Sequence, residues 1–272
     1  MRILISTDIE GVAGVVHPDQ TREGNADYGT ARRWMTLETN AAVAGAIDGG
    51  ATEVTVADAH GSYRNLLADE LDPRARLAMG KPRMLGMLGG LETGFDGVML
   101  VGFHARSQAP GVLAHTINSA AFARVWLNGQ ELGEAGLYGA LAGEIGVPIV
   151  FASGDDAFVD ETRPLFPAGI FVVTKKATGR QSAVSLSPQF SCEAIHAGAR
   201  QAMAMIDKAL PLGLETPVSV RLQTLSPAHA DLFCQWPTFE REDAVTLRYG
   251  AETVAHAVRV LNCLSAMASA LR

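Results

Sequence analysis

The chain has 272 residues, of which 48% are hydrophobic and 19% charged, so it can form a sizeable core and disorder is disfavoured. The 22 Lys and Arg residues against 29 Asp and Glu residues leave a formal net charge of −7. Because no basic stretch is longer than a pair such as Lys175-Lys176, the chain is a poor candidate for binding nucleic acid.

Short apolar runs alternate with helical patterns along the chain, which is typical of an α/β fold. Residues 2–6 predict a first strand. Residues 30–47 predict a helix, because apolar side chains recur there at a spacing close to 3.6, and Gly49-Gly50 would end it. Further strands are expected at residues 54–57, 97–101, 124–127, 148–151 and 170–173. Asn128-Gly129 predicts a tight turn, and residues 132–145 predict a glycine-rich helix.

The composition changes near residues 185–191, where Ser187-Pro188 predicts a boundary between two structural regions. Beyond it we expect a helix at 193–210, strands at 218–222 and 245–248, and a closing helix at 252–271. The length of the chain suits one large domain with a smaller one. The prediction is a layered αβα sheet domain over residues 1–190, with the metal site at the carboxyl ends of its strands, and a smaller C-terminal α+β region over residues 191–272.

Two further features concern the surroundings of the protein. The uncharged run at residues 260–271 is shorter than the roughly 18 residues that cross a bilayer, and Asp8 comes too early for a secretory signal. We therefore expect no membrane partner and a cytoplasmic location.

The three cysteines, Cys192, Cys234 and Cys263, are far apart and predict buried free thiols rather than disulfides or a thiolate zinc site.

Acidic residues and histidines follow several of the predicted strands. In open α/β sheets, ligands bind just beyond the carboxyl ends of the strands, so these side chains converge on one edge. The residues at these positions are Asp8, Glu10, Asp58, His60, His104, Asp155 and Asp156. Each alone is more often a solvated strand end or a structural histidine, and the combination carries the prediction.

Carboxylate and imidazole groups together suit zinc, manganese or iron. Two ions about 3.5–4 Å apart share a ligand, usually a bridging carboxylate. Asp8 and Glu10 point to one side if strand geometry continues, so they can serve neighbouring ions. Glu134, at the start of a predicted helix, is a source of a further carboxylate.

Four nearby residues lie outside this ligand set. Asp58 either orients the imidazole of His60 or caps the next turn. Asp155 and Asp156 either attract a substrate ammonium group or cap a helix that begins near Ala157, and we favour the cap. Arg106 is a candidate partner for a substrate carboxylate. No Gly-x-Ser-x-Gly, Walker A or His-Glu-x-x-His motif is present.

Five motifs follow one another in the chain, at residues 6–11, 58–60, 102–106, 110–115 and 133–137. This ordered set resembles the D-aminopeptidase family of metallopeptidases, M55, typified by a bacterial dipeptide-transport-operon protein. The similarity covers the whole chain, is densest up to about Asp156 and decreases in the last third. Members of that family are binuclear zinc exopeptidases that remove D-residues from the amino end of short peptides.

The resemblance implies a role for each of six residues. Asp8 would bridge two zinc ions per chain, Glu10 and His60 would complete the ligands of one ion, and His104 and Glu134 those of the other. Metal-bound hydroxide would then attack the peptide carbonyl. His115 matches a catalytic histidine and would protonate the leaving amine or stabilise the oxyanion.

The resemblance also implies a homodecamer of two stacked rings and short peptide substrates, including peptides that contain D-Ala. Two alternatives stay open. The first is a magnesium-dependent phosphatase of the haloacid-dehalogenase kind, whose Asp-x-Asp-Gly start is similar to Asp8-x-Glu10-Gly11 but departs at Glu10 and at Val12. The second is a non-catalytic, metal-binding, ring-forming homologue.

Overall fold

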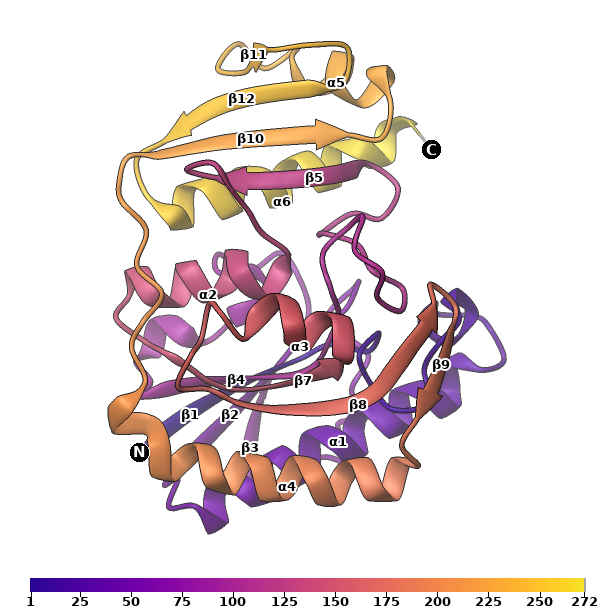
Figure 1. Ribbon diagram of the computed structural model, residues 1–272, viewed down its shortest axis with the longest axis vertical. Coiled ribbons are helices and arrows are strands. Elements are labelled where there is room, and N and C mark those ends of the chain that lie inside the picture. Colours follow the sequence, from indigo (N-terminus) through magenta and orange to yellow (C-terminus); the bar gives the residue numbers. More distant parts are fainter. Residues whose placement is uncertain (272) are drawn as a thin grey trace.

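The computed structural model describes residues 1–271, which form two β-sheets covered by helices (Figure 1). The larger sheet has seven strands in the order β3-β2-β1-β4-β7-β8-β9. Neighbouring strands are parallel except for the antiparallel pair β8–β9, which confirms the predicted α/β class. The strands are β1 (Arg2–Thr7), β2 (Glu53–Asp58), β3 (Ala75–Ala78), β4 (Gly97–Phe103), β7 (Ile149–Asp155), β8 (Ile170–Gly179) and β9 (Ser182–Ser185).

Helices cover both faces of the larger sheet, which is why its central strands are continuous apolar runs. α1 (Tyr28–Asp48) and α4 (Pro188–Met205) pack together on one face (Figure 1). α2 (Glu134–Glu144) and α3 (Asp156–Thr162) lie on the other. All seven residues of β4 are buried between these layers.

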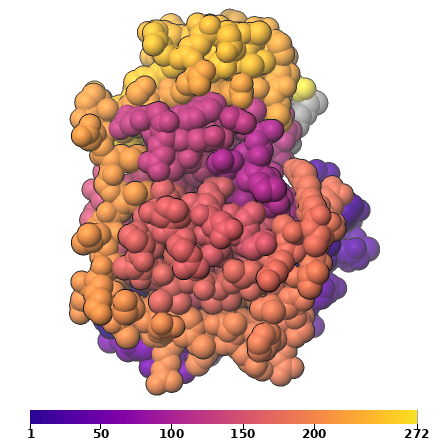
Figure 2. Space-filling model, in the orientation of Figure 1, coloured from indigo at the N-terminus to yellow at the C-terminus, as the bar shows by residue number. Residues whose placement is uncertain are grey.

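The smaller sheet is antiparallel and lies at the far end of the molecule from α1 and α4 (Figure 1). Its strand order is β11-β12-β10-β5-β6, so strands from the middle of the chain pair with strands near its end. In Figure 2 the magenta residues of that middle segment accordingly surface next to the yellow C-terminal residues. Its elements are β5 (Phe122–Leu127), β6 (Gln130–Glu131), β10 (Val218–Thr224), α5 (Pro227–Phe233), β11 (Glu240–Arg241), β12 (Thr246–Ala251) and α6 (Val254–Met267).

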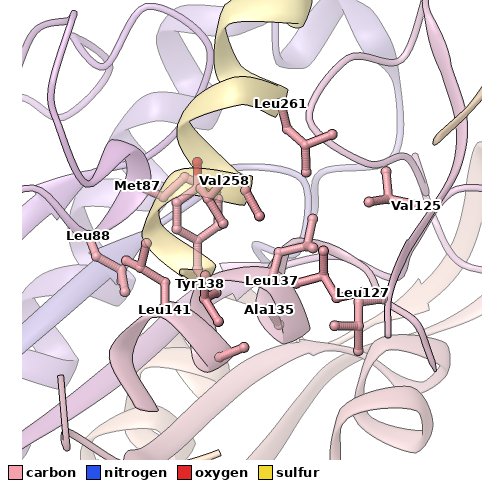
Figure 3. Packing of buried hydrophobic residues seen from close by; sticks show 14 of the residues in the cluster. Met87, Leu88, Val125, Leu127, Ala135, Leu137, Tyr138, Leu141, Val258 and Leu261 are labelled. Carbon is pink, nitrogen blue, oxygen red and sulfur yellow. The ribbon is translucent and has the colours of Figure 1, made fainter. Parts of the chain in front are cut away.

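One hydrophobic cluster connects the two sheets. Figure 3 shows Leu137 and Tyr138 of α2 packed toward Val258 and Leu261 of α6, beside Val125 of β5. Tyr138 also donates a hydrogen bond to Asn262 on α6, at 3.2 Å. The smaller sheet therefore packs on the larger domain through α2, and the predicted domain boundary near residue 190 stays a prediction.

Most predicted elements are present, with bounds shifted by a few residues. The helix expected at 193–210 begins earlier, at Pro188, because Ser187 accepts a hydrogen bond from the backbone N–H of Phe190 at 3.3 Å. Ser187-Pro188 is thus a helix start, for which serine caps and first-turn prolines are typical. β3 and β9 were not predicted, since both are short, partly exposed edge strands without an apolar run. The short 3₁₀ helices are η1 (Pro18–Gln20), η2 (Gly86–Leu88), η3 (Leu91–Thr93), η4 (Ile206–Lys208) and η5 (Ala268–Leu271).

The cysteines and the last helix differ from the sequence-based expectations. Cys192 and Cys234 are only partly buried and Cys263 is exposed, so the prediction of buried thiols was wrong. Residues Val254–Leu271 are apolar and long enough, by length and composition alone, to cross a membrane, and 33% of them are buried. This is weak evidence for a span, because helices that pack in protein cores pass the same test, and α6 packs against α2 and β10.

The point where the strand order reverses lies between β1 and β4, because β2 and β3 extend the sheet in one direction and β4 begins the other. There the backbone N–H of Gly11 donates to the carbonyl of Gly102 at 2.7 Å, and that of Asp8 to Val101 at 2.8 Å. Gly102 has a φ of +69°, and a Cβ atom on it would meet the Asp8 carbonyl and, at 2.9 Å, Val12 Cγ2. Glycine is therefore required where the two loops meet.

We predict that Gly102→Ala lowers the free energy of unfolding by about 2 kcal/mol or more, from the left-handed φ and the clash with the Asp8 loop. Gly213→Ala is the control, because a Cβ atom on Gly213 meets open space. Urea denaturation followed by circular dichroism measures both. Equal midpoints for the two variants would show that the close approach costs nothing.

Candidate metal centre

The six site residues predicted from sequence lie together at the carboxyl edge of the larger sheet. Five of them line one cavity of about 620 Å³, and the sixth, His104, is 2% exposed and buried against them. They come from separate elements: the loop after β1 (Asp8, Glu10), the loop after β2 (His60), the end of β4 (His104), the loop before β5 (His115) and the first residue of α2 (Glu134).

Asp8 stands between two groups of side chains. His60 Nδ1 lies 3.1 Å from Asp8 Oδ1 and 3.1 Å from Glu10 Oε2. On the other side, His104 Nε2 lies 3.5 Å from Asp8 Oδ2 and 3.6 Å from Glu134 Oε2. One carboxylate oxygen of Asp8 therefore faces each histidine, which is the geometry that a bridging ligand needs.

The spacing and the donor types fit zinc. Zinc binds nitrogen and oxygen at about 2.0–2.2 Å, which places tetrahedral ligand atoms about 3.4 Å apart. The observed separations of 3.1–3.6 Å match that spacing. His104 Nε2 is buried and makes no hydrogen bond within the described residues, as expected of an atom aimed at a cation.

Backbone carbonyls hold the three imidazoles. His60 Nε2 lies 2.8 Å from the carbonyl of Thr21, His104 Nδ1 lies 2.9 Å from that of Ala105, and His115 Nδ1 lies 3.0 Å from that of Leu113. Each contact sets the ring orientation and leaves the second nitrogen facing the carboxylates, as is common for metal-binding histidines.

Burial and mutual repulsion shape the electrostatics of the site. Burial, together with the charge of Glu10, raises the pKa of Asp8 to about 7. Burial alone would lower the pKa of His104, but the carboxylates of Glu134 and Asp8 raise it to about 10. The pKa of His115 is lowered by burial and by His104, whose ring stacks on it at 4.1 Å. The buried carboxylates thus need positive charge, and His115 is the imidazole that stays neutral most readily.

A buried lysine that was not predicted supports the loop after β1. Lys175 on β8 is 2% exposed, and its Nζ donates to the carbonyls of Glu10, Val12 and Val15 at 2.5, 2.8 and 2.5 Å. Three accepting carbonyls match the three donors of an ammonium group. The lysine therefore fixes the backbone on which Glu10 stands.

Glu38 on α1 holds the same loop from the other side. Its Oε1 accepts hydrogen bonds from the backbone N–H of Ala13 at 2.9 Å and from Ser191 Oγ at 2.7 Å. The side chain is buried, and its Oε2 has no hydrogen-bond partner among the described residues. In the sequence, the one indication of this role is that Glu38 is a charged residue on the otherwise apolar face of a predicted helix.

The structure also shows the contacts of three further acidic and basic residues near the motifs. Asp58 accepts hydrogen bonds from the N–H groups of Asn65 and Leu66 at 2.5 and 2.8 Å, so it caps that turn and does not contact the His60 ring. Asp155 caps α3 through Phe158 N at 2.7 Å, which confirms the favoured interpretation. Arg106 does not line the cavity, and its Nε lies 3.7 Å from Glu131 Oε1 and 4.0 Å from Glu161 Oε2, so its proposed contact with a substrate carboxylate stays a hypothesis.

Comparisons with known proteins agree with this geometry. The sequence model of the M55 peptidase family, described as D-aminopeptidase, matches residues 1–263. A D-aminopeptidase of Bacillus subtilis (strain 168) is 33% identical over 214 residues, which are 78% of this chain and 77% of that protein. The solved structure of the zinc-dependent D-aminopeptidase DppA from Bacillus subtilis, a self-compartmentalizing protease, superposes with a TM-score of 0.96 at 27% identity, covering 99% of this chain and 98% of that one.

The chain belongs to the M55 family of D-aminopeptidases, and it is a peptidase.

Glu38 predicts a pH-dependent stability. Burial raises its pKa to about 7, so the folded protein keeps a proton that the unfolded chain releases above its ordinary value of 4.5. The stability linked to this proton is present below pH 4.5 and is lost as the pH rises to 7. Glu38→Gln cannot titrate, so its stability relative to the wild type should rise by about 2–3 kcal/mol between pH 5 and pH 7.5.

Urea denaturation at several pH values measures this difference. Glu193→Gln, which changes an exposed glutamate on α4, is the control and should follow the wild type. Parallel curves for the wild type and Glu38→Gln would contradict the prediction.

Proposed function

We propose that this protein is a binuclear zinc-dependent aminopeptidase that releases N-terminal D-amino acids from short peptides. The observation that carries the proposal is Asp8, which presents one oxygen to His60 and the other to His104. Membership of the M55 family and the likeness to a zinc-dependent D-aminopeptidase support it.

The two ligand groups follow from the same distances. Glu10 and His60 would hold one ion with Asp8, and His104 and Glu134 would hold the other. When bound, zinc supplies Lewis acidity, which polarises a peptide carbonyl and lowers the pKa of water to about 7. Lys175 would keep Glu10 in place by fixing the backbone of its loop.

His115 is the proposed catalytic residue. Its Nδ1 lies 3.0 Å from the carbonyl of Leu113, so the proton of the neutral ring resides on that nitrogen. Nε2 lies 3.7 Å from Glu134 Oε1, and the side chain lines the cavity. In this tautomer Nε2 can accept a proton and pass it to the leaving amine.

Four further proposals rest on the sequence and the resemblance. They are a preference for D-residues, substrates that contain D-Ala, a homodecamer and a cytoplasmic location. The description of the related structure as self-compartmentalizing supports an oligomer. The phosphatase alternative has no use for His60 and His104, and an inactive homologue has no use for a neutral His115 at the cavity wall. Neither alternative is favoured.

We predict about two zinc ions per chain in protein purified without chelator, measured by plasma mass spectrometry. Removing the metal should abolish hydrolysis of D-Ala-D-Ala, and adding zinc should restore it.

His104→Ala should bind fewer ions and lose activity by roughly 100-fold or more, with its circular dichroism unchanged. His196→Ala, on the outer side of α4 beside Asp48, is the control. Full activity in His104→Ala would refute the ligand assignment.

We predict that His115→Gln keeps both zinc ions and lowers kcat by about 10²–10⁴-fold, because the proton transfer is lost while the ligands stay. Steady-state kinetics on D-Ala-D-Ala and L-Ala-L-Ala, with metal analysis of the same samples, measures the effect and the D-preference together. A variant that lost zinc in step with activity would mean that His115 is a ligand.

A further inference from the structure

The mouth of the cavity is positively charged. Arg22, Lys81 and Arg180 line it and are exposed, and Arg83 lines it in a half-buried position. The acidic residues of the lining are Asp8, Glu10 and Glu134, the proposed zinc ligands. Within residues 1–271, none of the four basic side chains lies within 4.0 Å of a carboxylate. Among the described residues, this positive charge is therefore not neutralised by a carboxylate within 4.0 Å.

Two of these side chains stand beside the His60 loop. The ring of Tyr63 lies under Arg83 Cζ at 4.1 Å and under Lys81 Nζ at 5.7 Å. Tyr63 N donates to the carbonyl of His60 at 2.8 Å, which ties this platform to the metal centre. The guanidinium of Arg83 donates hydrogen bonds to the backbone carbonyls of Ala78 and Asp58. Of the two cations beside Tyr63, the ammonium of Lys81 is therefore the one available to a ligand.

Arg180 stands beside the His115 loop. It lies in the turn between β8 and β9, and its carbonyl accepts a hydrogen bond from the N–H of Leu113 at 2.9 Å. The carbonyl of Leu113 in turn contacts His115 Nδ1. The side chain of Arg180 is thus exposed at the mouth, on a backbone connected to the proposed catalytic residue.

We propose that Arg180 and Lys81 bind the C-terminal carboxylate of the substrate, so that the enzyme acts on short peptides with a free C-terminus. This inference rests on the proposed function, because it takes the N-terminal end of the peptide to lie at the metals. A carboxylate is then the one formal charge at the other end of a peptide with apolar side chains. Arginine binds it through two parallel hydrogen bonds, and lysine binds it as a point charge.

The dimensions of the cavity agree. An extended chain spans about 3.5 Å per residue, so a dipeptide or tripeptide covers about 7–10 Å. A volume of about 620 Å³ lies within the range of small-ligand pockets. A longer peptide would place its carboxylate outside the mouth, beyond Arg180 and Lys81, and would lose the interaction.

The test compares D-Ala-D-Ala with the same dipeptide amidated at its C-terminus, using zinc-loaded protein. In the wild type, kcat/KM for the free acid should exceed that for the amide by about tenfold or more, because a charge-assisted contact is lost. Arg180→Gln and Lys81→Gln should lower kcat/KM for the acid, mainly through KM, more than for the amide, so that the ratio of acid to amide falls toward one. Arg200→Gln, an exposed arginine on α4 outside the cavity, should change neither.

The outcomes separate this inference from the proposed function. Equal rates on acid and amide in the wild type, or variants that slow both substrates alike, would overturn the carboxylate site and leave the peptidase assignment intact. Failure of the wild type to cleave either substrate, with two zinc ions bound, would overturn both.

Discussion

The burial of three neighbouring carboxylates is the constraint around which the site is organised. Asp8, Glu10 and Glu134 are each 4% exposed or less, and they belong to two neighbouring groups of candidate metal ligands that share His104. Such groups are costly to bury unless positive charge or hydrogen-bond donors compensate them. The backbone N–H groups of Ile9 and Ile117 donate to Asp8 and Glu134, and Glu134 also begins a helix, where the dipole favours an anion. Histidines supply part of the remaining charge, and divalent cations would supply the rest.

The topology brings these groups together at the reversal of strand order. β1, β2 and β4 are neighbours in the sheet and end at the same edge, so Asp8, His60 and His104 meet there. The close approach of Gly11 and Gly102 sets the distance between the first and third loops. The smaller sheet adds the other wall, since Asn118, near His115, donates to Ser265 on α6 at 3.1 Å. Both layers are therefore needed to enclose the cavity.

Sequence alone could predict the part of the site that follows from strand ends. Apolar runs that predict strands precede Asp8, Glu10, His60 and His104. Because parallel strands end at the same edge of a sheet, these four residues were expected to lie together. Glu134 was a candidate from its place at the start of a predicted helix, whereas His115 needed the family resemblance, because its position depends on how the segment between β4 and α2 folds back. The ligand and catalytic roles of all six stay predictions.

Other residues could not be predicted, because a distant partner decides their role. Lys175 lies in a strand, and its burial depends on three backbone carbonyls of a loop more than 150 residues earlier, which accept hydrogen bonds from its ammonium group. Arg106 adjoins a motif, yet the carboxylates of Glu131 and Glu161 take it up. Finally, β5 pairs with β10, almost 100 residues later in the chain. During synthesis β5 can therefore pair only with the two-residue strand β6 until residues 218–224 have left the ribosome, and long-range pairing of this kind forms late. The cavity wall that carries His115 is therefore completed only after β10 has been synthesised, roughly 100 residues after His115 itself.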